Sequence, residues 1–381
     1  MIKRSNPRLH LRRASCWLLF AAGGLPPIAC AGPEPGELIL PLTPVAASRS
    51  PLSLNESIAL VSEAVACVID SYQVRVHCIG RDDAPARVFG RRGRGPGELE
   101  DPNRVVRGPD ETIGVIDYST DRMSVFTPGG ELVSEVRIDG IAFTPSAPFG
   151  ASLIGNALYR GTDGPEHRQM AVDVTSGEVL WERVYPNELR EESGCDANSI
   201  RGLGYGAASS GGAMVFPACG GHLIYFLGPD DEAGRLVATP TYVPELPNER
   251  DVRFLEELRK DAIQSGGFVL PASAVEEYRR TPVPYSHYLW FDGRNRLWVL
   301  TRRDRDAWSY LDVYDPAGEY AGTVRVRDRG VGFDILGSTL AVLVERQAGP
   351  DDADGIPDRA IDWYDIGGLE FGLRRDNQGG G

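Results

Sequence analysis

The chain has 381 residues, 42% of them hydrophobic, which is enough to bury a large core in one or two domains. With 54 acidic and 40 basic residues, its formal net charge is −14 at pH 7. A surface this acidic repels phosphodiester backbones, which argues against a nucleic-acid partner and favours cationic ligands or metal ions.

Residues 1–31 are predicted to be an export signal. The basic segment MIKRSNPRLHLRR precedes the apolar run ASCWLLFAAGGL, and small residues follow. The apolar run is shorter than the ~20 residues that a transmembrane helix needs, and this order of segments is typical of secretory signals. No later segment is long and apolar enough to cross a membrane. We therefore expect an exported protein, periplasmic or extracellular.

Two forms of processing fit the end of this signal. Ala29-Cys30-Ala31 matches an A-x-A cleavage site, which would leave a soluble mature protein. Ile28-Ala29-Cys30 also resembles the end of a bacterial lipobox, in which Cys30 would be acylated and would anchor the protein to a membrane. Because Pro27 stands where lipoboxes usually carry leucine, we favour cleavage without lipidation.

Six later segments share one repeated pattern of short strands and turns. TIGVIDYSTDRMSVFTPGGELVSEVRI, for example, alternates apolar strands with a polar turn and a glycine turn. Like units recur at roughly 40 to 50 residues, the period of a β-propeller blade. The sequence thus predicts an all-β fold over residues 32–374, a six-bladed β-propeller of four-stranded antiparallel blades. The predicted blades are 55–90, 100–139, 141–186, 196–243, 284–327 and 329–374.

Three segments do not follow this repeated pattern. Residues 248–280 carry Phe254, Leu255 and Leu258 at helical spacing, which predicts a helical insertion between blades four and five. The apolar segment GELILPLTPV at 36–45 is expected to close the ring as the outer strand of blade six. The tail 375–381 is expected to be disordered.

The glycine-rich stretch FGRRGRGPGELEDP (89–102) joins the first two blades. Its spacing does not fit a dinucleotide fingerprint, it lacks the Gly-Lys-Ser/Thr of a Walker loop, and an Arg/Gly nucleic-acid arm would need a basic context. A radial crossover between blades must turn tightly, which favours glycine and proline. We interpret the stretch as architecture rather than as a phosphate site.

The same stretch, continued to residue 132, resembles an NHL-type repeat over about 45 residues. The positions that match are Gly90, Gly93, Gly97, Leu99, Pro102, Asp117, Arg122 and Phe126. The later blades resemble those of secreted bacterial six-bladed propellers of that superfamily. The resemblance implies a binding or interaction protein that uses its central funnel or one face. The alternative is a hydrolase, lactonase or lyase with an axial metal, because propellers host both classes.

Four cysteines follow the signal, an even number that suits an oxidising compartment. In each predicted hairpin, counting residues outward from the turn places two cysteines opposite each other: Cys67 and Cys78 in blade one, and Cys195 and Cys219 in blade four. Cross-strand neighbours lie within reach of a disulfide, so we predict these two pairs. The alternative is four buried thiols that act as small hydrophobes.

The stretch DDADGIPD (351–358) is the clearest metal candidate. Asp352, Asp354 and Asp358 surround a glycine as in calcium loops, although Pro350 replaces the first aspartate and no glutamate closes the loop. The alternative is an acidic hairpin turn. Calcium is the only cofactor that the sequence suggests.

Other chemistry-bearing residues are scattered along the chain. The histidines after the signal are His77, His167, His222 and His287, which show no metal spacing, so packing is the default interpretation. Residues 285–303 are rich in aromatics that could line a funnel mouth, but packing between blades is favoured: Tyr285, Tyr288, Trp290, Phe291 and Trp298. We expect a monomer that binds a protein, peptide or glycan and is not an enzyme.

Overall fold

The structure is a computed structural model, and its chain divides into residues 1–37 and the unit Leu38–Gly381. The fold described below belongs to the second unit. The residues that the structure describes are 38–50, 57–82, 84, 87–138, 141–161, 164–184, 206–209, 213–217, 223–227, 234–238, 260, 289–301, 308–346 and 358–371. The predicted signal, all of the predicted insertion except Lys260, and the predicted tail lie outside these ranges.

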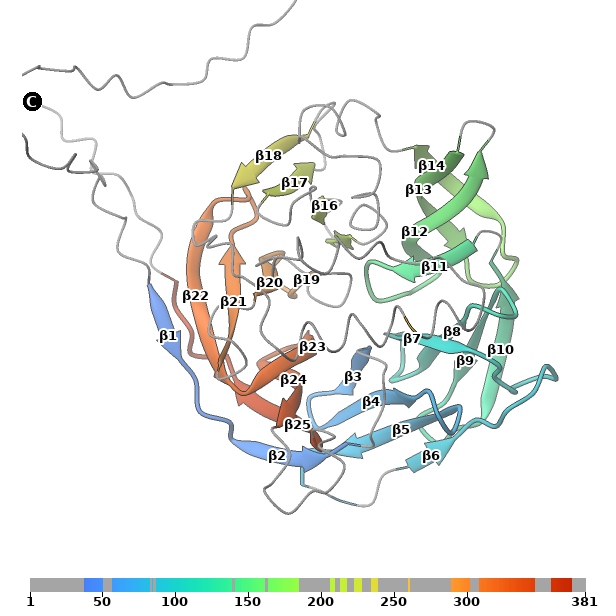
Figure 1. Ribbon diagram of the computed structural model, residues 1–381, viewed down its shortest axis with the longest axis horizontal. Helices are drawn as coiled ribbons and strands as arrows, with labels where there is room; N and C mark the ends of the chain where they lie inside the picture. The colour runs from blue at the N-terminus through green and yellow to red at the C-terminus, as the bar shows by residue number, and fades with distance from the viewer. Residues whose placement is uncertain are drawn as a thin grey trace, which may run out of the picture. The chain divides into compact units, whose positions relative to one another are not determined.

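Six antiparallel sheets follow one another around a ring, which is the predicted six-bladed β-propeller (Figure 1). Blades one and two consist of β3 (Ile58–Ser62), β4 (Val65–Asp70), β5 (Arg75–Gly80) and β6 (Arg87–Phe89), then β7 (Pro102–Arg107), β8 (Ile113–Asp117), β9 (Arg122–Phe126) and β10 (Leu132–Arg137). Blades three and four consist of β11 (Ile141–Pro145), β12 (Ser152–Gly161), β13 (Gly164–Asp173) and β14 (Val179–Val184), then β15 (Ala207–Ala208), β16 (Met214–Pro217), β17 (Leu223–Leu227) and β18 (Arg235–Ala238).

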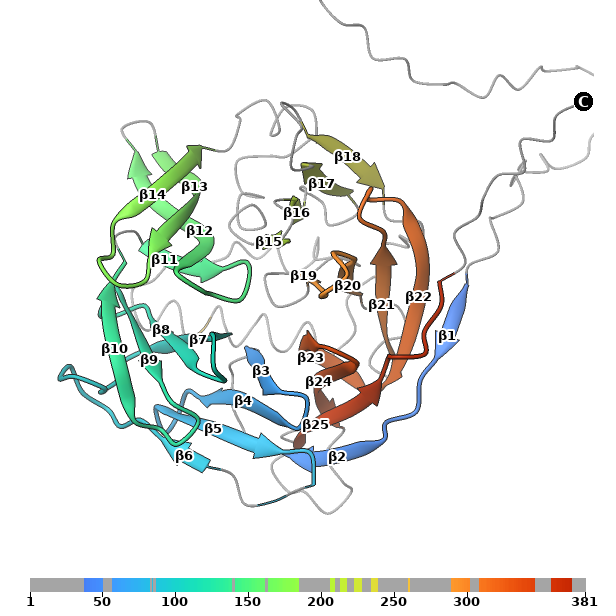
Figure 2. The ribbon, with the colours of Figure 1, turned by 180° about the vertical axis from the view of Figure 1, so that it is seen from behind.

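Blades five and six complete the ring. Blade five consists of β19 (Leu289–Phe291), β20 (Leu297–Thr301), β21 (Trp308–Tyr314) and β22 (Tyr320–Arg327). Blade six consists of β23 (Arg329–Leu336), β24 (Thr339–Arg346) and β25 (Asp358–Asp365), with β2 (Ala46–Arg49) as its fourth strand. The first strand of each blade lies nearest the centre, as the view from behind also shows (Figure 2).

Burial differs between the strands of a blade. Every residue of β8 and β20 is buried, because these strands are covered on both sides by neighbouring blades. The outer strand β10 is mostly exposed. The apolar clusters lie between blades rather than within them: Ile69 and Val76 of blade one pack in one cluster with Val115 of blade two. Each blade is therefore stabilised by its neighbours around the ring, since apolar burial is the main favourable term in folding.

Ring closure differs from the prediction. The expected closing segment, 36–45, supplies β1 (Ile39–Pro41), which pairs in parallel with β22 and so adds a fifth strand to blade five. The next strand, β2, pairs antiparallel with β25 and completes blade six. The buried Ser48 of β2 donates to the carbonyl of Gly80 in blade one at 2.7 Å and accepts from Trp363 Nε1 at 3.0 Å. Residues 46–49, not 36–45, therefore join the last blade to the first.

The hairpin of blade one carries a disulfide. Cys67 on β4 lies directly opposite Cys78 on β5, and the two form a disulfide, as the sequence predicts. Both residues are buried between blades one and two. Cys195 and Cys219 lie outside the described residues, so their pairing stays a prediction.

Candidate functional site

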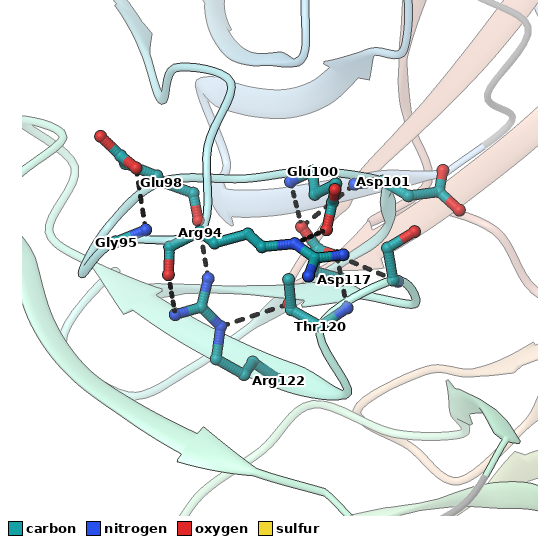
Figure 3. Close-up of polar contacts among 9 residues, drawn as sticks. Arg94, Gly95, Glu98, Glu100, Asp101, Asp117, Thr120 and Arg122 are labelled. Carbon is teal, nitrogen blue, oxygen red and sulfur yellow. Dashed lines mark hydrogen bonds and ion pairs between the residues drawn. The ribbon is translucent and has the colours of Figure 1, made fainter.

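The glycine-rich stretch is a crossover held by carboxylates. Asp117, at the end of β8, accepts backbone hydrogen bonds through Oδ2 from Glu100 (2.6 Å) and Asp101 (3.2 Å), as Figure 3 shows. Its Oδ1 accepts from the N–H groups of Ser119 (3.1 Å) and Thr120 (3.2 Å). One buried aspartate thus holds both the crossover and the turn after β8.

Arg122 and two glycines complete this crossover. Arg122 donates to the carbonyl of Arg94 at 3.3 Å and to that of Glu98 at 3.0 Å (Figure 3). Gly90 and Gly97 have φ values of +85° and +71°, which residues other than glycine rarely adopt. The hydrogen bonds from Asp117 and Arg122 tie the stretch to blade two, which agrees with architecture rather than with a phosphate cradle.

A small cavity opens where the innermost strands meet, with about 30 Å³ of space for the centres of water-sized molecules. Its lining residues come from β7, β11, β19 and β23 and from residues 57–59 at the start of β3. Apolar and polar residues share the wall equally, and the polar lining residues are Ser57, Arg104, Arg107, Thr144, Trp290 and Asp334. We call this space the axial cavity.

A buried ion pair crosses one side of the axial cavity. Arg107 donates through Nη1 to Asp334 Oδ2 at 2.9 Å and to the carbonyl of Leu60 at 3.0 Å. Asp334 Oδ2 also accepts from the Leu60 N–H at 2.7 Å, and Oδ1 accepts from the Ile335 N–H at 2.7 Å. Burial raises the pKa of Asp334, and Arg107 opposes that rise. The pair therefore links the inner strands of blades one, two and six.

A second arginine of the cavity wall is held in position by its neighbours. Arg104 donates to the carbonyl of Asn103 at 2.9 Å, and its guanidinium carbon lies 5.8 Å from the centroid of the Tyr118 ring. The Tyr118 hydroxyl lies 3.1 Å from Thr144 Oγ1 on β11. A guanidinium fixed in this way needs little reordering to meet a ligand.

The aromatic stretch 285–303 divides between two roles. Trp290 lines the axial cavity, and its buried Nε1–H has no hydrogen-bond acceptor among the described residues. Phe291 and Trp298 are core residues between blades, as the packing interpretation expects. Tyr285 and Tyr288 lie outside the described residues. Trp290 also packs against the apolar cluster between blades five and six, as the packing interpretation expects, and its position on an inner strand places it at the cavity as well.

The structure brings together little of the predicted metal chemistry. Asp352 and Asp354 lie outside the described residues, and the backbone of Asp358 begins β25. His77 lies on β5, the third strand of blade one, where its Nε2 is 3.9 Å from Asp70 Oδ2. His167 lies on β13, also a third strand, and His222 and His287 are outside the described ranges. Within those ranges, no three His, Cys, Asp or Glu side chains form a group that could hold a metal ion.

Sequence reasoning missed three residues of the cavity: Arg104, Arg107 and Asp334. All of them lie on first strands, β7 or β23. The signal that could have found them is their place in the blade, because polar or bulky residues on a first strand are the ones that can face the axis.

No protein-family model matches the chain, and no curated protein is similar to it in sequence. Among solved structures, it is similar to a DUF4221 family member from Bacteroides vulgatus, at 13% identity and a TM-score of 0.48, with 84% of this chain and 97% of that one covered.

Two further solved structures are similar at the same level. Regucalcin from Agrobacterium tumefaciens, a calcium-binding protein, is 12% identical, with a TM-score of 0.41 and coverage of 88% of this chain and 99% of that one. Virginiamycin B lyase from Staphylococcus aureus is 13% identical, with a TM-score of 0.36 and coverage of 83% and 85%. The propeller assignment rests on the strand order of this chain and not on these likenesses. Among the residues that the structure describes, no helix is long and apolar enough to cross a membrane.

Proposed function

We propose that this protein is an exported binding protein that holds its ligand in the axial cavity. The observation that carries the proposal is the cavity itself, because first strands from five of the six blades contribute its wall. Small-molecule sites combine apolar residues with a few positioned polar groups, and both kinds of residue line this cavity. The ligand is a small molecule, or the protruding group of a peptide or glycan.

Two features support export. The order of basic, apolar and small residues in 1–31 is that of a secretory signal. The Cys67–Cys78 disulfide suits an oxidising compartment, since such bonds are rare in the cytosol. Mass spectrometry of protein from its native host tests this proposal. A mature N-terminus near Cys30 supports it, a mass gain on Cys30 indicates lipidation, and an intact Met1 on cytosolic protein contradicts it.

Fluorine NMR of protein labelled with 5-fluorotryptophan tests the binding site. Trp290 lies in the axial cavity, whereas Trp181 lies on the outer strand β14 and is 39% exposed. A library of small fragments should yield binders that shift the Trp290 resonance and leave that of Trp181 in place. A Trp290→Phe variant assigns the resonance. Binders that shift only Trp181, or a library that shifts neither residue, would contradict an axial site.

Metal analysis of protein purified without a chelator separates this proposal from a propeller enzyme with an axial metal. The binding protein should carry no stoichiometric transition metal, and fragments should bind at the axial cavity all the same. A stoichiometric metal whose removal abolishes the Trp290 response would favour the enzyme.

A further inference from the structure

The hydroxyl groups on the wall of the axial cavity already have partners inside the protein. Ser57 Oγ accepts a hydrogen bond from the Val105 N–H at 2.9 Å. Thr144 Oγ1 lies 3.1 Å from the Tyr118 hydroxyl. Both groups are therefore bonded to the protein before a ligand arrives.

The charged residues of the wall are engaged in the same way. Arg107 donates to Asp334 Oδ2 at 2.9 Å, and both oxygens of Asp334 also accept from backbone N–H groups. Arg104 donates to the carbonyl and to the side-chain oxygen of Asn103. A charged ligand would give up its hydration here and would have to compete with these bonds for a partner, which makes its transfer from water costly.

Trp290 offers carbon to the cavity. Its Nε1 atom is buried, whereas the residue as a whole is partly exposed and packs on its other side against the apolar cluster between blades five and six. A ligand that touches this side chain therefore meets indole carbons. Ile58, Val105 and Phe333 add apolar residues to the same wall.

The space inside the cavity admits only a small group. About 30 Å³ is open to the centres of water-sized molecules. Because one water needs roughly 10–15 Å³ of such space, the cavity has room for about two groups of that size. A larger ligand must therefore leave most of its atoms outside.

We infer that the axial cavity selects a small uncharged apolar group, such as the methyl or ethyl end of a ligand whose remainder lies outside the cavity. Entry of this group removes apolar surface from water, and that gain requires no hydrogen bond from the wall. A charged or strongly polar group of the same size loses its hydration without finding a vacant partner among the printed contacts of Ser57, Arg107 and Asp334. This inference rests on the proposed axial binding site.

Iodide, xenon and caesium test the preference for an uncharged group, because they have the same number of electrons and differ in charge. Titration against the Trp290 fluorine resonance measures each probe, with sodium chloride as the control for ionic strength. Xenon, which binds in dry apolar cavities, should shift the resonance in a saturable way. The two ions should shift it no more than sodium chloride does. Binding of either ion as tightly as xenon would overturn the inference.

Primary alcohols of increasing length test the size of the inserted group. From methanol to ethanol the affinity read at Trp290 should rise by about fourfold, the gain expected for one buried methylene. The rise should level off by butanol, because the cavity is then full and further carbons lie outside. A rise that continues at the same rate to hexanol would contradict the size limit.

Matched variants connect the selection to the wall. Val105→Thr places a hydroxyl in the wall with little change in volume and should weaken xenon binding by at least about threefold. The control is Val115→Thr: Val115 lies opposite Val105 on β8, in the same apolar cluster, and is not among the described lining residues. Circular dichroism checks that both variants are folded, and the probes on the unaltered protein decide if Val105→Thr does not fold.

The outcomes separate two failures. Charged fragments that shift Trp290, together with xenon that does not, would overturn the apolar selection and leave the axial site intact. Equal loss of xenon affinity in the two threonine variants would also overturn it. A fragment library that never shifts Trp290 would instead remove the proposed function on which the inference rests.

Discussion

Arg107 on β7 and Asp334 on β23 lie 227 residues apart in the sequence, yet their side chains form a 2.9 Å ion pair beside the propeller axis. Asp334 is 3% exposed and Arg107 is 13% exposed in their side chains. The same two residues also bond to the backbone of Leu60 in blade one. The pair thus connects the blades on either side of the ring closure to blade two.

Removing one partner of this pair should be costly. Arg107→Met leaves Asp334 as an uncompensated buried charge, so the free energy of unfolding should fall by about 3–5 kcal/mol. The double variant Arg107→Met/Asp334→Leu should recover part of that loss, because no buried charge remains. Urea unfolding measures both, with Arg87→Met as the control that changes little. Losses that simply add in the double variant would show that the pair is not coupled.

Ring closure should depend on β2 far more than on β1. A shortened chain that begins at residue 43 loses only the fifth strand of blade five, whereas one that begins at residue 51 also loses the strand that completes blade six. We expect a small fall in melting temperature for the first and a large one for the second. Ser48→Ala should lower the free energy of unfolding by about 1–3 kcal/mol. The substitution removes the hydrogen bonds that Ser48 makes to Trp363 Nε1–H and to the carbonyl of Gly80. Equal melting temperatures for the two shortened chains would contradict this assignment.

Asp117 should control the order of the glycine-rich crossover. Asp117→Ala removes the acceptor of four backbone N–H groups, so we expect a loss of at least about 3 kcal/mol. Trypsin should also cleave the variant faster after Arg91, Arg92 and Arg94. The matched control is Asp173→Ala, which removes a similar turn acceptor from an exposed site in blade three. Unchanged cleavage in Asp117→Ala would contradict the role given to this residue.

His77 should make stability depend on pH in mildly acidic solution. Burial lowers the pKa of His77 below 6.5, and Asp70 opposes that shift. Between the folded and unfolded pKa values, the unfolded chain binds a proton that the folded chain does not. The free energy of unfolding should therefore decrease as the pH falls from 6.5 towards the folded pKa. Above pH 6.5 this contribution to stability should be fully present. Histidine NMR measures the pKa, and His77→Gln should flatten this part of the stability profile. A folded pKa above 6.5 would reverse the sign.

Non-reducing peptide mapping tests both cysteine pairs. Cys67 should be found linked to Cys78, and the remaining prediction is a link between Cys195 and Cys219. Replacing Cys67 and Cys78 by serine should cost about 2–4 kcal/mol, because the bond closes a loop of sequence separation 11 in the unfolded chain. Cys67 linked to Cys195 or Cys219 would contradict the pairing.

The sequence by itself determined the features that depend on neighbours along the chain. Blade two was expected at 100–139, and its strands span Pro102–Arg137. Cys67 and Cys78 could be paired because a short hairpin leaves little choice of register. The glycine-rich crossover could be recognised because its backbone needs positive φ at Gly90 and Gly97, and glycine is the residue that adopts such values readily.

Only the tertiary structure decided which distant segments meet. The apolar segment 36–45 was a better strand by composition than Ala46–Arg49, yet ring closure uses the latter because its register with β25 places Ser48 between two blades. Arg104, Arg107, Trp290 and Asp334 have no shared local motif, and they meet only because first strands converge on one axis. A contact between residues more than 200 positions apart is set by closure of the ring, and local periodicity carries no information about it.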